Sequence, residues 1–398
     1  KISVLCGSNV TAADHQHADT LLHHSLSYQL PDNPQIDQLE EARQIAGFIR
    51  EHISPDTLLH CHNVNLGKNP ALSAVIFQLA GEGYAMVNHC HDFPEDRPEN
   101  IAFLEKVLTG KFGINLHKLL YPDYPRYHFV VLNSCDHQRV LKQGISEDRI
   151  HLLPNPVDLH KIAEDGNLAE VRQHIAEKLG LDPLKKICTY PVRAIRRKNI
   201  GEFLLLAALF VKEAAFVITQ PPKNPVEFPG YNRWKDFCKI IRLDIKYEAG
   251  DAVNHEMVIG ISDFCITTSF REGFGMVYLE PWIAGIPVIG RDLECITADL
   301  RQYGLVFPRL YKEIRIRSRS GLRDFKDLTP VEQEECIKGV RESGEEKEML
   351  LSDNPFLHYL LGPVSDEIII KNRQIIEENF TVGKYGERLL AIYKGISG

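Results

Sequence analysis

The chain has 398 residues, 44% of them hydrophobic and 25% charged, which is the composition of a folded protein of roughly two domains. Its net charge of -8 argues against a nucleic-acid-binding protein, which needs a basic face for the phosphates. The nine cysteines contain no C-x-x-C pair, and no apolar run reaches the roughly 18 residues of a membrane span. We therefore expect free thiols in a cytoplasmic protein without a transmembrane segment.

Short apolar runs alternate with amphipathic segments, which is typical of parallel strands joined by crossover helices. In the first half, strands are predicted at 2–6, 57–62, 85–89, 129–133 and 150–153, and helices at 38–52 and 71–80. The alternation pauses at LPNPVD and a polar helix at 168–179, and then restarts. The second half predicts strands at 186–192, 215–219, 243–247, 264–268, 287–290 and 305–307, and a helix at 200–212.

The restart predicts an α/β protein with two doubly wound Rossmann-like domains. We expect the first at 1–183, completed by a C-terminal helix at 376–398, and the second at 184–375 with an insertion around 309–354. Ligands of open parallel sheets bind beyond the carboxyl ends of the strands, so the two domains are expected to face a central cleft that holds the site.

The segment SFREGFGMVYLEPWIAGIPVIG, residues 269–290, places the carboxylates of Glu272 and Glu280 on either side of a glycine pair. Because Pro281 is tolerated only in the first turn of a helix, we expect regular helix from about residue 277, preceded by free backbone N–H groups. Those groups and the helix dipole suit a phosphate, whereas a carboxylate accepts hydrogen bonds from a vicinal diol. This arrangement fits a nucleotide sugar. The alternative is a Gly-rich turn with Glu280 as a capping charge.

A bound diphosphate needs countercharge, and two residues of YPVRAIRRKN are placed to supply it. Arg193 lies just past a predicted strand, and Lys198 lies at the start of the next helix. We assign Arg196 and Arg197 to a solvated face. No D-x-D motif occurs, so no metal site is predicted at the diphosphate. The basic segment 309–323 is interpreted as a solvated loop or edge strand, with an acidic partner or a membrane surface as the less favoured interpretation.

Three segments together resemble a known family: VLNSCDHQRVLKQGISEDRIHLLPNPVD, VRAIRRKN and REGFGMVYLEPWIAGIPVI. They are similar to the retaining glycosyltransferases of the GT-B architecture, glycosyltransferase family four (glycosyl transferases group 1). The likeness runs from about Val130 to Gly304, and NFTVGKYGERLLAIY is similar to the closing helix of that family. Two departures are Ser269 before Phe270 and the basic stretch after Phe307.

The resemblance implies a donor site in the second domain. Glu272 would contact the donor sugar and Glu280 the ribose, while Arg193, Lys198 and the backbone after Glu272 would hold the diphosphate. The donor-binding residues expected in full are Gly7, Arg193, Lys198, Glu272, Gly273, Phe274, Gly275, Met276, Val277 and Glu280. Gly7 is included because the turn after the first strand is placed to approach the diphosphate.

The first domain is expected to bind the acceptor. In VNHCHDFPED, His91 matches a histidine that in the family often contacts the transferred sugar. The resemblance therefore implies four catalytic residues: His91, Arg193, Lys198 and Glu272. The alternative is that His91 is only hydrogen-bonded within its own loop. The acceptor-binding residues expected are Asn63, Lys68, Asp92 and Arg97. Lys68 precedes a predicted N-cap and first-turn proline, and a plain cap with a solvated lysine is equally compatible.

The two H-C-H triplets, residues 60–62 and 89–91, also invite a zinc interpretation, because His and Cys are preferred zinc ligands. We disfavour it from the sequence, since the residues lie at adjacent strand ends in an acidic context. The cysteines are instead interpreted as core residues.

The function expected is retaining transfer of a hexosyl group from a nucleoside-diphosphate sugar to a hydroxyl of a small, soluble and possibly anionic acceptor. The enzyme is expected to be metal-independent, without a prosthetic group. Alternatives are a GT-B disaccharide phosphorylase, a glycosyltransferase acting on a lipid or polysaccharide, and a non-catalytic nucleotide-sugar sensor. The sequence does not specify the sugar, the base or the acceptor.

Overall fold

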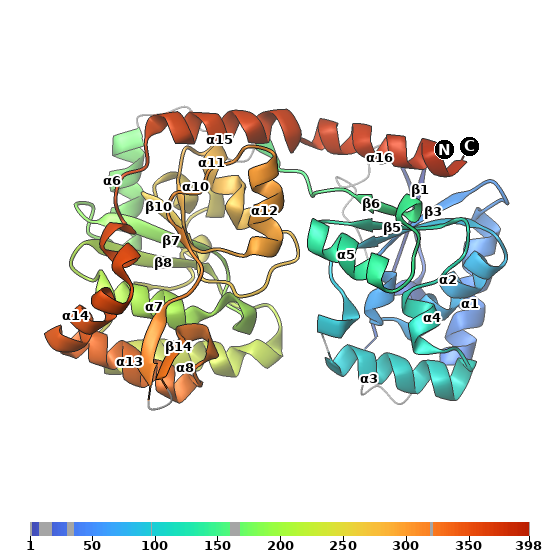
Figure 1. Cartoon of the computed structure of the whole chain (residues 1–398). Helices are drawn as coiled ribbons and strands as arrows, with labels where there is room; N and C mark the ends of the chain where they lie inside the picture. Colours follow the sequence, from blue (N-terminus) through green and yellow to red (C-terminus); the bar gives the residue numbers. More distant parts are fainter. Residues whose placement is uncertain are drawn as a thin grey trace. The chain divides into compact units, whose positions relative to one another are not determined.

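The computed structural model describes residues 2–7, 18–29, 36–96, 98–159, 168–318 and 321–397. Its internal contacts divide the chain into two compact units, which are coloured along the sequence in Figure 1. The first unit comprises Lys1–Asn155 and Tyr385–Gly398, and the second comprises Pro156–Lys384.

The first unit is built on a four-stranded parallel sheet. Its strands lie in the order β3 (Leu58–His62), β4 (Ala85–Cys90), β5 (Tyr127–Val131) and β6 (Ile150–Leu152). A separate parallel pair is formed by β1 (Ser3–Cys6) and β2 (Asp19–Leu22). These positions confirm the strands predicted in the first half to within a few residues.

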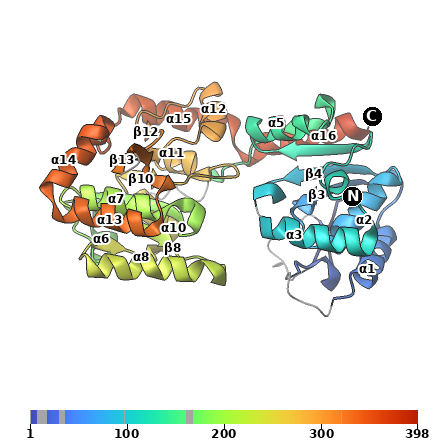
Figure 2. The same cartoon turned by 60° about the horizontal axis from the view of Figure 1, so that its bottom comes forward.

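Helices cover both faces of this sheet, because side chains alternate along each strand. Met86 and Cys90 of β4 pack toward α1 (Gln38–His52) and α2 (Pro70–Gly81). Ala85 and Val87 pack toward α16 (Val382–Ser397), on the other face (Figure 2). The remaining helices of this unit are α3 (Pro98–Val107), α4 (Leu116–Leu120) and α5 (Ser134–Lys142).

The second unit contains a six-stranded sheet in which every pairing is parallel. Its order is β12 (Leu310–Tyr311), β11 (Val288–Arg291), β10 (Phe264–Thr267), β7 (Lys186–Arg193), β8 (Ala214–Gln220) and β9 (Ile245–Lys246). The restart of the alternation thus corresponds to a second doubly wound sheet, and the α/β fold class is confirmed.

The two faces of this sheet carry separate apolar clusters. The larger one joins the strands to α7 (Ile200–Leu209) and α8 (Phe228–Ile240). The smaller one joins Ile187 and Val217 to α6 (Leu168–Leu179) and α10 (His255–Gly260) (Figure 1). Because α6 packs here, the first boundary between the units lies before this helix, at residue 155, whereas we expected it after the helix, at residue 183.

The segment expected as an insertion folds onto the second unit. It contains the antiparallel hairpin β13 (Arg315–Ser318) and β14 (Gly321–Asp324), followed by α13 (Pro330–Glu342) and α14 (Gly344–Asp353). Ile337 and Leu350 of these helices belong to the larger cluster. The remaining helices of the unit are α9 (Ala249–Ala252), α11 (Glu280–Ile283), α12 (Glu294–Gln302) and α15 (Asp366–Asn379).

The strand expected at 305–307 was wrong. The backbone N–H and C=O of Val306 bond to the side chain of Asn372 rather than to a strand, and Phe307 packs against the rings of Tyr278 and Trp282. The edge strand that completes the sheet is β12, slightly further along the chain. Among the described helices, none combines the length and the apolarity that crossing a membrane requires.

Candidate functional site

The turn after β7 carries the cationic residues that the sequence pointed to. Arg193 is the last residue of β7, and Lys198 ends a 3-10 turn formed by Arg196–Lys198. The carbonyl of Lys198 accepts hydrogen bonds from the hydroxyls of Tyr190 (2.6 Å) and Thr268 (2.9 Å). Since Thr268 follows β10, the carboxyl ends of β7 and β10 fix this turn together.

Glu272 lies against this turn and closes an ion-pair cluster. Its Oε1 accepts a hydrogen bond from Lys198 Nζ, and its Oε2 accepts one from Arg197 Nη1 at 3.1 Å. The side chains of Glu272 and Lys198 are 6% and 10% exposed. The expectation that Arg197 belongs to a solvated face was wrong, because Arg197 is half-buried against Glu272. No spacing rule predicts a contact between residues so far apart in the chain.

Burial lowers the pKa of Lys198, and the adjacent Glu272 carboxylate opposes that shift. The ion pair therefore offsets the desolvation free energy of burying the charged ammonium group of Lys198. A carboxylate has about four lone-pair sites, so Glu272 can accept further hydrogen bonds while Lys198 and Arg197 remain bound. Arg193, by contrast, is exposed, and its guanidinium has no hydrogen bond or ion pair among the described residues. It is available to an incoming anion.

The predicted helix after Glu272 is shorter than expected. Gly275 has φ +80°, a conformation that glycine adopts readily, and a 3-10 turn at Met276–Tyr278 follows it. Regular α-helix begins only at Glu280 and spans four residues, with Pro281 in its first turn. The helix dipole that we expected here is consequently small. The first N–H groups of the 3-10 turn still lack an intrahelical partner, as in any helical turn.

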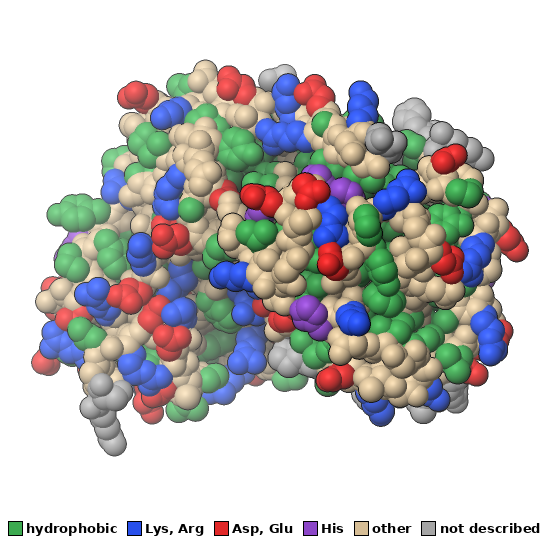
Figure 3. Space-filling view, turned by 45° about the vertical axis from the view of Figure 1, so that its right-hand side comes forward, with side chains coloured by type: hydrophobic (Ala, Val, Ile, Leu, Met, Phe, Trp, Pro, Cys, Tyr) green, Lys and Arg blue, Asp and Glu red, His purple; other side chains and the backbone are tan. Residues whose placement is uncertain are grey.

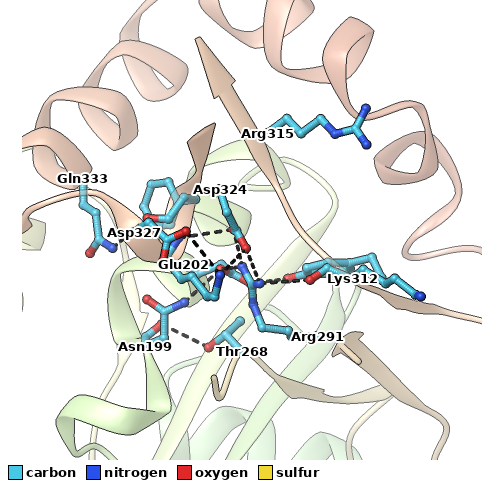
Figure 4. Close-up of polar contacts among 12 residues, drawn as sticks. Asn199, Glu202, Thr268, Arg291, Lys312, Arg315, Asp324, Asp327 and Gln333 are labelled. Carbon is cyan, nitrogen blue, oxygen red and sulfur yellow. Dashed lines mark hydrogen bonds and ion pairs between the residues drawn. The ribbon is translucent and has the colours of Figure 1, made fainter. Parts of the chain in front are cut away.

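A buried polar network supports the turn from behind (Figure 4). The carboxylate of Glu202, in the first turn of α7, binds Asn199, Arg291 and the hydroxyl of Tyr311. Arg291, whose side chain is 2% exposed, also donates two hydrogen bonds of 2.8 Å to Asp324 in β14. Burial raises the pKa of Glu202 and Arg291 counters it. The network thus links the Lys198 turn, the end of β11 and the hairpin.

A cavity of about 420 Å³ opens beside the same turn, between α7, α8 and the start of α13. Arg196, Trp234 and Phe270 contribute to its wall, whereas Lys198 and Glu272 do not. The candidate donor residues therefore lie outside this cavity.

In the first unit, Asn63 connects the ends of β3 and β4. It has φ +55°, and its Oδ1 accepts hydrogen bonds from the backbone N–H groups of His91 (2.7 Å) and Asp92 (3.2 Å). The Nε2 atom of His91 is hydrogen-bonded to Nδ1 of His62 at 3.0 Å. Asn63, which we predicted to bind the acceptor, thus also holds the His91 loop in place.

Imidazole side chains gather around His91. One ring nitrogen each of His60, His62 and His89 lies within 4.8 Å of one ring nitrogen of the others, which makes this a group of side chains able to hold a metal ion. The neighbouring Cys90 points to the opposite face, where it is a buried free thiol with a raised pKa, as expected for a core cysteine.

Two further predicted residues, Lys68 for the acceptor and Gly7 for the donor, lie in segments that meet the start of α2. Asn69 is the N-cap and Pro70 the first helical residue, as predicted. Lys68 places its ammonium 4.6 Å from the centre of the Tyr28 ring. Gly7 packs closely against the backbone of Ser27, since a Cβ atom there would lie 2.1 Å from the Ser27 nitrogen. Arg97 lies outside the described residues. The roles predicted for these residues, and for those of the second unit, stay predictions.

Three arginines in the described part of the basic segment 309–323 form ion pairs within the chain. Arg315 pairs with Glu313, Arg317 with Asp353, and Arg323 with Glu332. Positive and negative side chains are also interspersed over the face shown in Figure 3. These pairs favour the interpretation as a solvated edge hairpin.

Comparison with solved structures identifies the fold class. The chain superposes on Anabaena Alr3699/HepE in complex with UDP-glucose with a TM-score of 0.62, at 12% identity, covering 98% of this chain and 91% of that one. A glycosyltransferase from Rickettsia africae gives a TM-score of 0.60 at 15% identity, covering 98% and 89%. The fold is the GT-B fold of glycosyltransferases, as the sequence predicted.

Two characterised relatives share sequence with the chain, and both are from Petrotoga mobilis. Mannosylglucosyl-3-phosphoglycerate synthase is 30% identical over 274 residues, which are 65% of this chain and 51% of that protein. Mannosylglucosylglycerate synthase is 22% identical over 320 residues, or 73% and 70%. The chain thus spans about half the length of the first relative. No protein-family model matches the chain.

Proposed function

We propose that the protein is a retaining glycosyltransferase, of the family-four type, that transfers a hexosyl group from a nucleoside-diphosphate sugar to a small anionic acceptor. The observation that carries this proposal is the cluster of Lys198, Arg197 and Glu272, together with Arg193 at the end of β7, whose guanidinium has no hydrogen bond or ion pair among the described residues. Cationic groups that meet a carboxylate at the ends of parallel strands match the two halves of such a donor, its diphosphate and its sugar hydroxyls.

In the proposed reaction, Arg193 and Lys198 stabilise the diphosphate as it leaves, together with the backbone N–H groups that follow Gly275. Glu272 accepts hydrogen bonds from the donor sugar, and Glu280 binds the ribose. The acceptor hydroxyl attacks on the face that the diphosphate leaves, and a departing phosphate oxygen takes its proton. The protein then contributes positioning and charge stabilisation. We propose that no metal ion is needed at the diphosphate.

The acceptor class follows from the first Petrotoga relative, whose name contains a glycosylated 3-phosphoglycerate. We propose an acceptor of this kind, a phosphorylated glycerate or its glycoside, with Lys68 and Asp92 among the residues that bind it. Arg97 is kept as a second candidate cation. His91 is proposed to contact the transferred sugar.

The test is a transfer assay with purified protein and a panel of UDP-, GDP- and ADP-sugars. 3-Phosphoglycerate, its glucoside and unphosphorylated glycerate serve as acceptors. The proposal expects one donor to give an anionic glycoside in the presence of a chelator, with the phosphorylated acceptors preferred. Absence of transfer from every donor, with tight donor binding retained, would point instead to a nucleotide-sugar sensor.

Glu280 separates the proposal from a phosphorylase of the same fold. A phosphorylase uses phosphate or a sugar phosphate and has no ribose to bind. Glu280→Gln should therefore weaken nucleotide binding, measured as the thermal shift that the nucleoside diphosphate produces relative to the same variant without ligand. Efficient phosphorolysis of a disaccharide by both proteins would contradict the transferase assignment.

A further inference from the structure

A group of histidines in the first unit has no part in the donor chemistry proposed above. His60 and His62 alternate with Cys61 along β3, so both rings lie on the same face of the sheet. His89 is the register partner of His62 in the neighbouring strand β4. This is the face that α16 covers, and Tyr385 and Tyr393 of α16 contact the histidine rings.

The ring nitrogens are already close to the spacing of a metal site. His60 Nε2 lies 3.3 Å from His89 Nδ1, and all three residues offer a nitrogen within 4.8 Å of the others. Two nitrogens bound to one tetrahedral Zn²⁺ at about 2.0–2.1 Å lie about 3.3 Å apart. The pair of His60 Nε2 and His89 Nδ1 has this separation.

His89 provides an independent sign that a partner is missing from this group. Its side chain is fully buried, at 0% exposure, and its Nε2 has no hydrogen-bond partner among the described residues. Buried polar atoms without a partner are rare in folded proteins, and this one lies in a ring that contacts three other imidazoles. The unpartnered atom is Nε2, whereas the nitrogen 3.3 Å from His60 is Nδ1, so the ring has one nitrogen in use and one open to a ligand.

The surroundings also suit a metal-binding histidine. The Nδ1 atom of His60 is hydrogen-bonded to the hydroxyl of Tyr393, which leaves Nε2 directed toward His89. Metal-bound histidines usually have their second nitrogen fixed by such a partner. His62 is exposed, which gives an ion a route of entry.

We propose that His60, His62 and His89 bind one divalent cation of the Zn²⁺ class, with the fourth coordination position left to water. Three imidazoles favour zinc and its transition-metal neighbours over Mg²⁺ or Ca²⁺, which prefer oxygen ligands. The ion joins β3 to β4 and, through Tyr393, fixes the docking of α16. The proposal does not rest on the proposed transfer reaction, although His62 and His89 both contact His91, the residue proposed to meet the transferred sugar. It revises the interpretation made from the sequence, which disfavoured zinc.

The experiment is a titration of the full-length, tag-free and chelator-treated protein with Zn²⁺ and Co²⁺. We expect one Zn²⁺ per chain by calorimetry, a visible d–d band on Co²⁺ binding, and a higher melting temperature with the metal. His62→Asn, at an exposed position, should weaken binding more than tenfold, and Tyr393→Phe should weaken it about tenfold. Excess Mg²⁺ should not displace the ion.

The matched control is His128→Asn. His128 and His151 form another stacked histidine pair of the first unit, with a nitrogen separation of 3.0 Å, but they belong to no group of three ligands among the described residues. This variant should bind Zn²⁺ like the wild type. The proposal is overturned if the wild-type protein binds no Zn²⁺ or Co²⁺, or if His62→Asn and His128→Asn change the affinity equally. Circular dichroism of each variant excludes misfolding as the cause.

Discussion

At the scale of single residues, Arg193 and Lys198 differ in their surroundings although both are proposed to hold the same diphosphate. Arg193 is exposed and unpaired among the described residues, whereas Lys198 is buried against Glu272. Both Arg193→Ala and Lys198→Ala should lower kcat by about two orders of magnitude or more, the scale of losing one donor to a developing negative charge. Steady-state rates with the identified donor provide the measurement.

The two variants should differ in their free energy of unfolding. Arg193 is exposed, and Arg193→Ala removes no hydrogen bond or ion pair of the described residues, so its free energy of unfolding should change by less than about 0.5 kcal/mol. Lys198→Ala leaves the buried Glu272 with Arg197 alone and should cost about 2 kcal/mol. Arg196→Ala, at an exposed position in the same turn, is the control and should alter neither quantity. Equal stability of all three proteins in urea would contradict the ion-pair argument.

The lowered pKa of His128 leads us to expect that the free energy of unfolding depends on pH. Burial, together with His151 and Arg149, lowers the pKa of His128 to about 4 in the folded chain, below its usual value near 6.5. Between these two values the unfolded chain binds more protons, so stability falls as the pH is lowered through this window. The side chain is only partly buried, and we expect it to contribute about 1 kcal/mol to the loss between pH 7 and pH 5.

Urea unfolding of the wild type and of His128→Asn at both pH values measures this effect. The variant should lose about 1 kcal/mol less on acidification than the wild type does. His358→Asn, at an exposed position of the second unit, serves as the control and should follow the wild type. An unchanged pH dependence in His128→Asn would show that the ring is already charged at pH 5.

At the scale of elements, the Glu202–Arg291–Asp324 network decides how the Lys198 turn is held. Glu202 belongs to α7, Arg291 ends β11, and Asp324 lies in β14, so three segments distant in sequence meet in one buried place (Figure 4). Removing one partner of a buried ion pair leaves an uncompensated charge and costs about 3–5 kcal/mol. Glu202→Ala should therefore destabilise the protein by about that amount.

A matched control is the exposed pair of Asp236 and Lys239 on α8, whose side chains are 67% and 74% exposed. Asp236→Ala should cost less than about 0.5 kcal/mol. Glu202→Gln should lie between the two, since it keeps the shape of the side chain and an acceptor for Arg291. If Glu202→Ala were as stable as Asp236→Ala, the network would not support the turn.

Local signals in the sequence were sufficient for most of these elements. The two-residue alternation located the strands of both sheets, and Asn69 with Pro70 located the start of α2. The apolar run at 305–307 failed, because a short apolar run does not reveal whether its backbone bonds to a strand or to a side chain such as Asn372. Such partners are fixed only when distant segments pack.

The site was predictable in its residue types but not in its contacts. The spacing of Glu272, Arg193 and Lys198 indicated an anion site beside a sugar site. It gave no sign that Arg197 also binds Glu272, or that Glu202 and Arg291 support the turn from the core. The histidines show the same limit, since the pairing of His62 with His89 depends on the register of β3 against β4. Register is set by tertiary packing.

At the scale of the whole molecule, the two units have separate apolar cores, and most of the predicted donor contacts belong to the second unit. A ligand that binds only the folded state stabilises it by about 2.7 kcal/mol at a concentration one hundred times its Kd. The nucleoside diphosphate should therefore slow hydrogen exchange mainly in peptides of the second unit, notably those spanning β7, α7 and β10, whose residues form the proposed diphosphate site.

Mass-spectrometric hydrogen exchange, with and without the diphosphate, measures this distribution directly. Glu280→Gln is the control, because it weakens ribose binding without removing a cation, and its exchange pattern should change little on adding the same concentration of ligand. Protection confined to peptides of β3, β4 and β5 would contradict the assignment of the donor to the second unit. Zn²⁺ should have the complementary effect, with slower exchange around β3, β4 and α16, because its proposed ligands and their hydrogen-bond partner Tyr393 lie in the first unit.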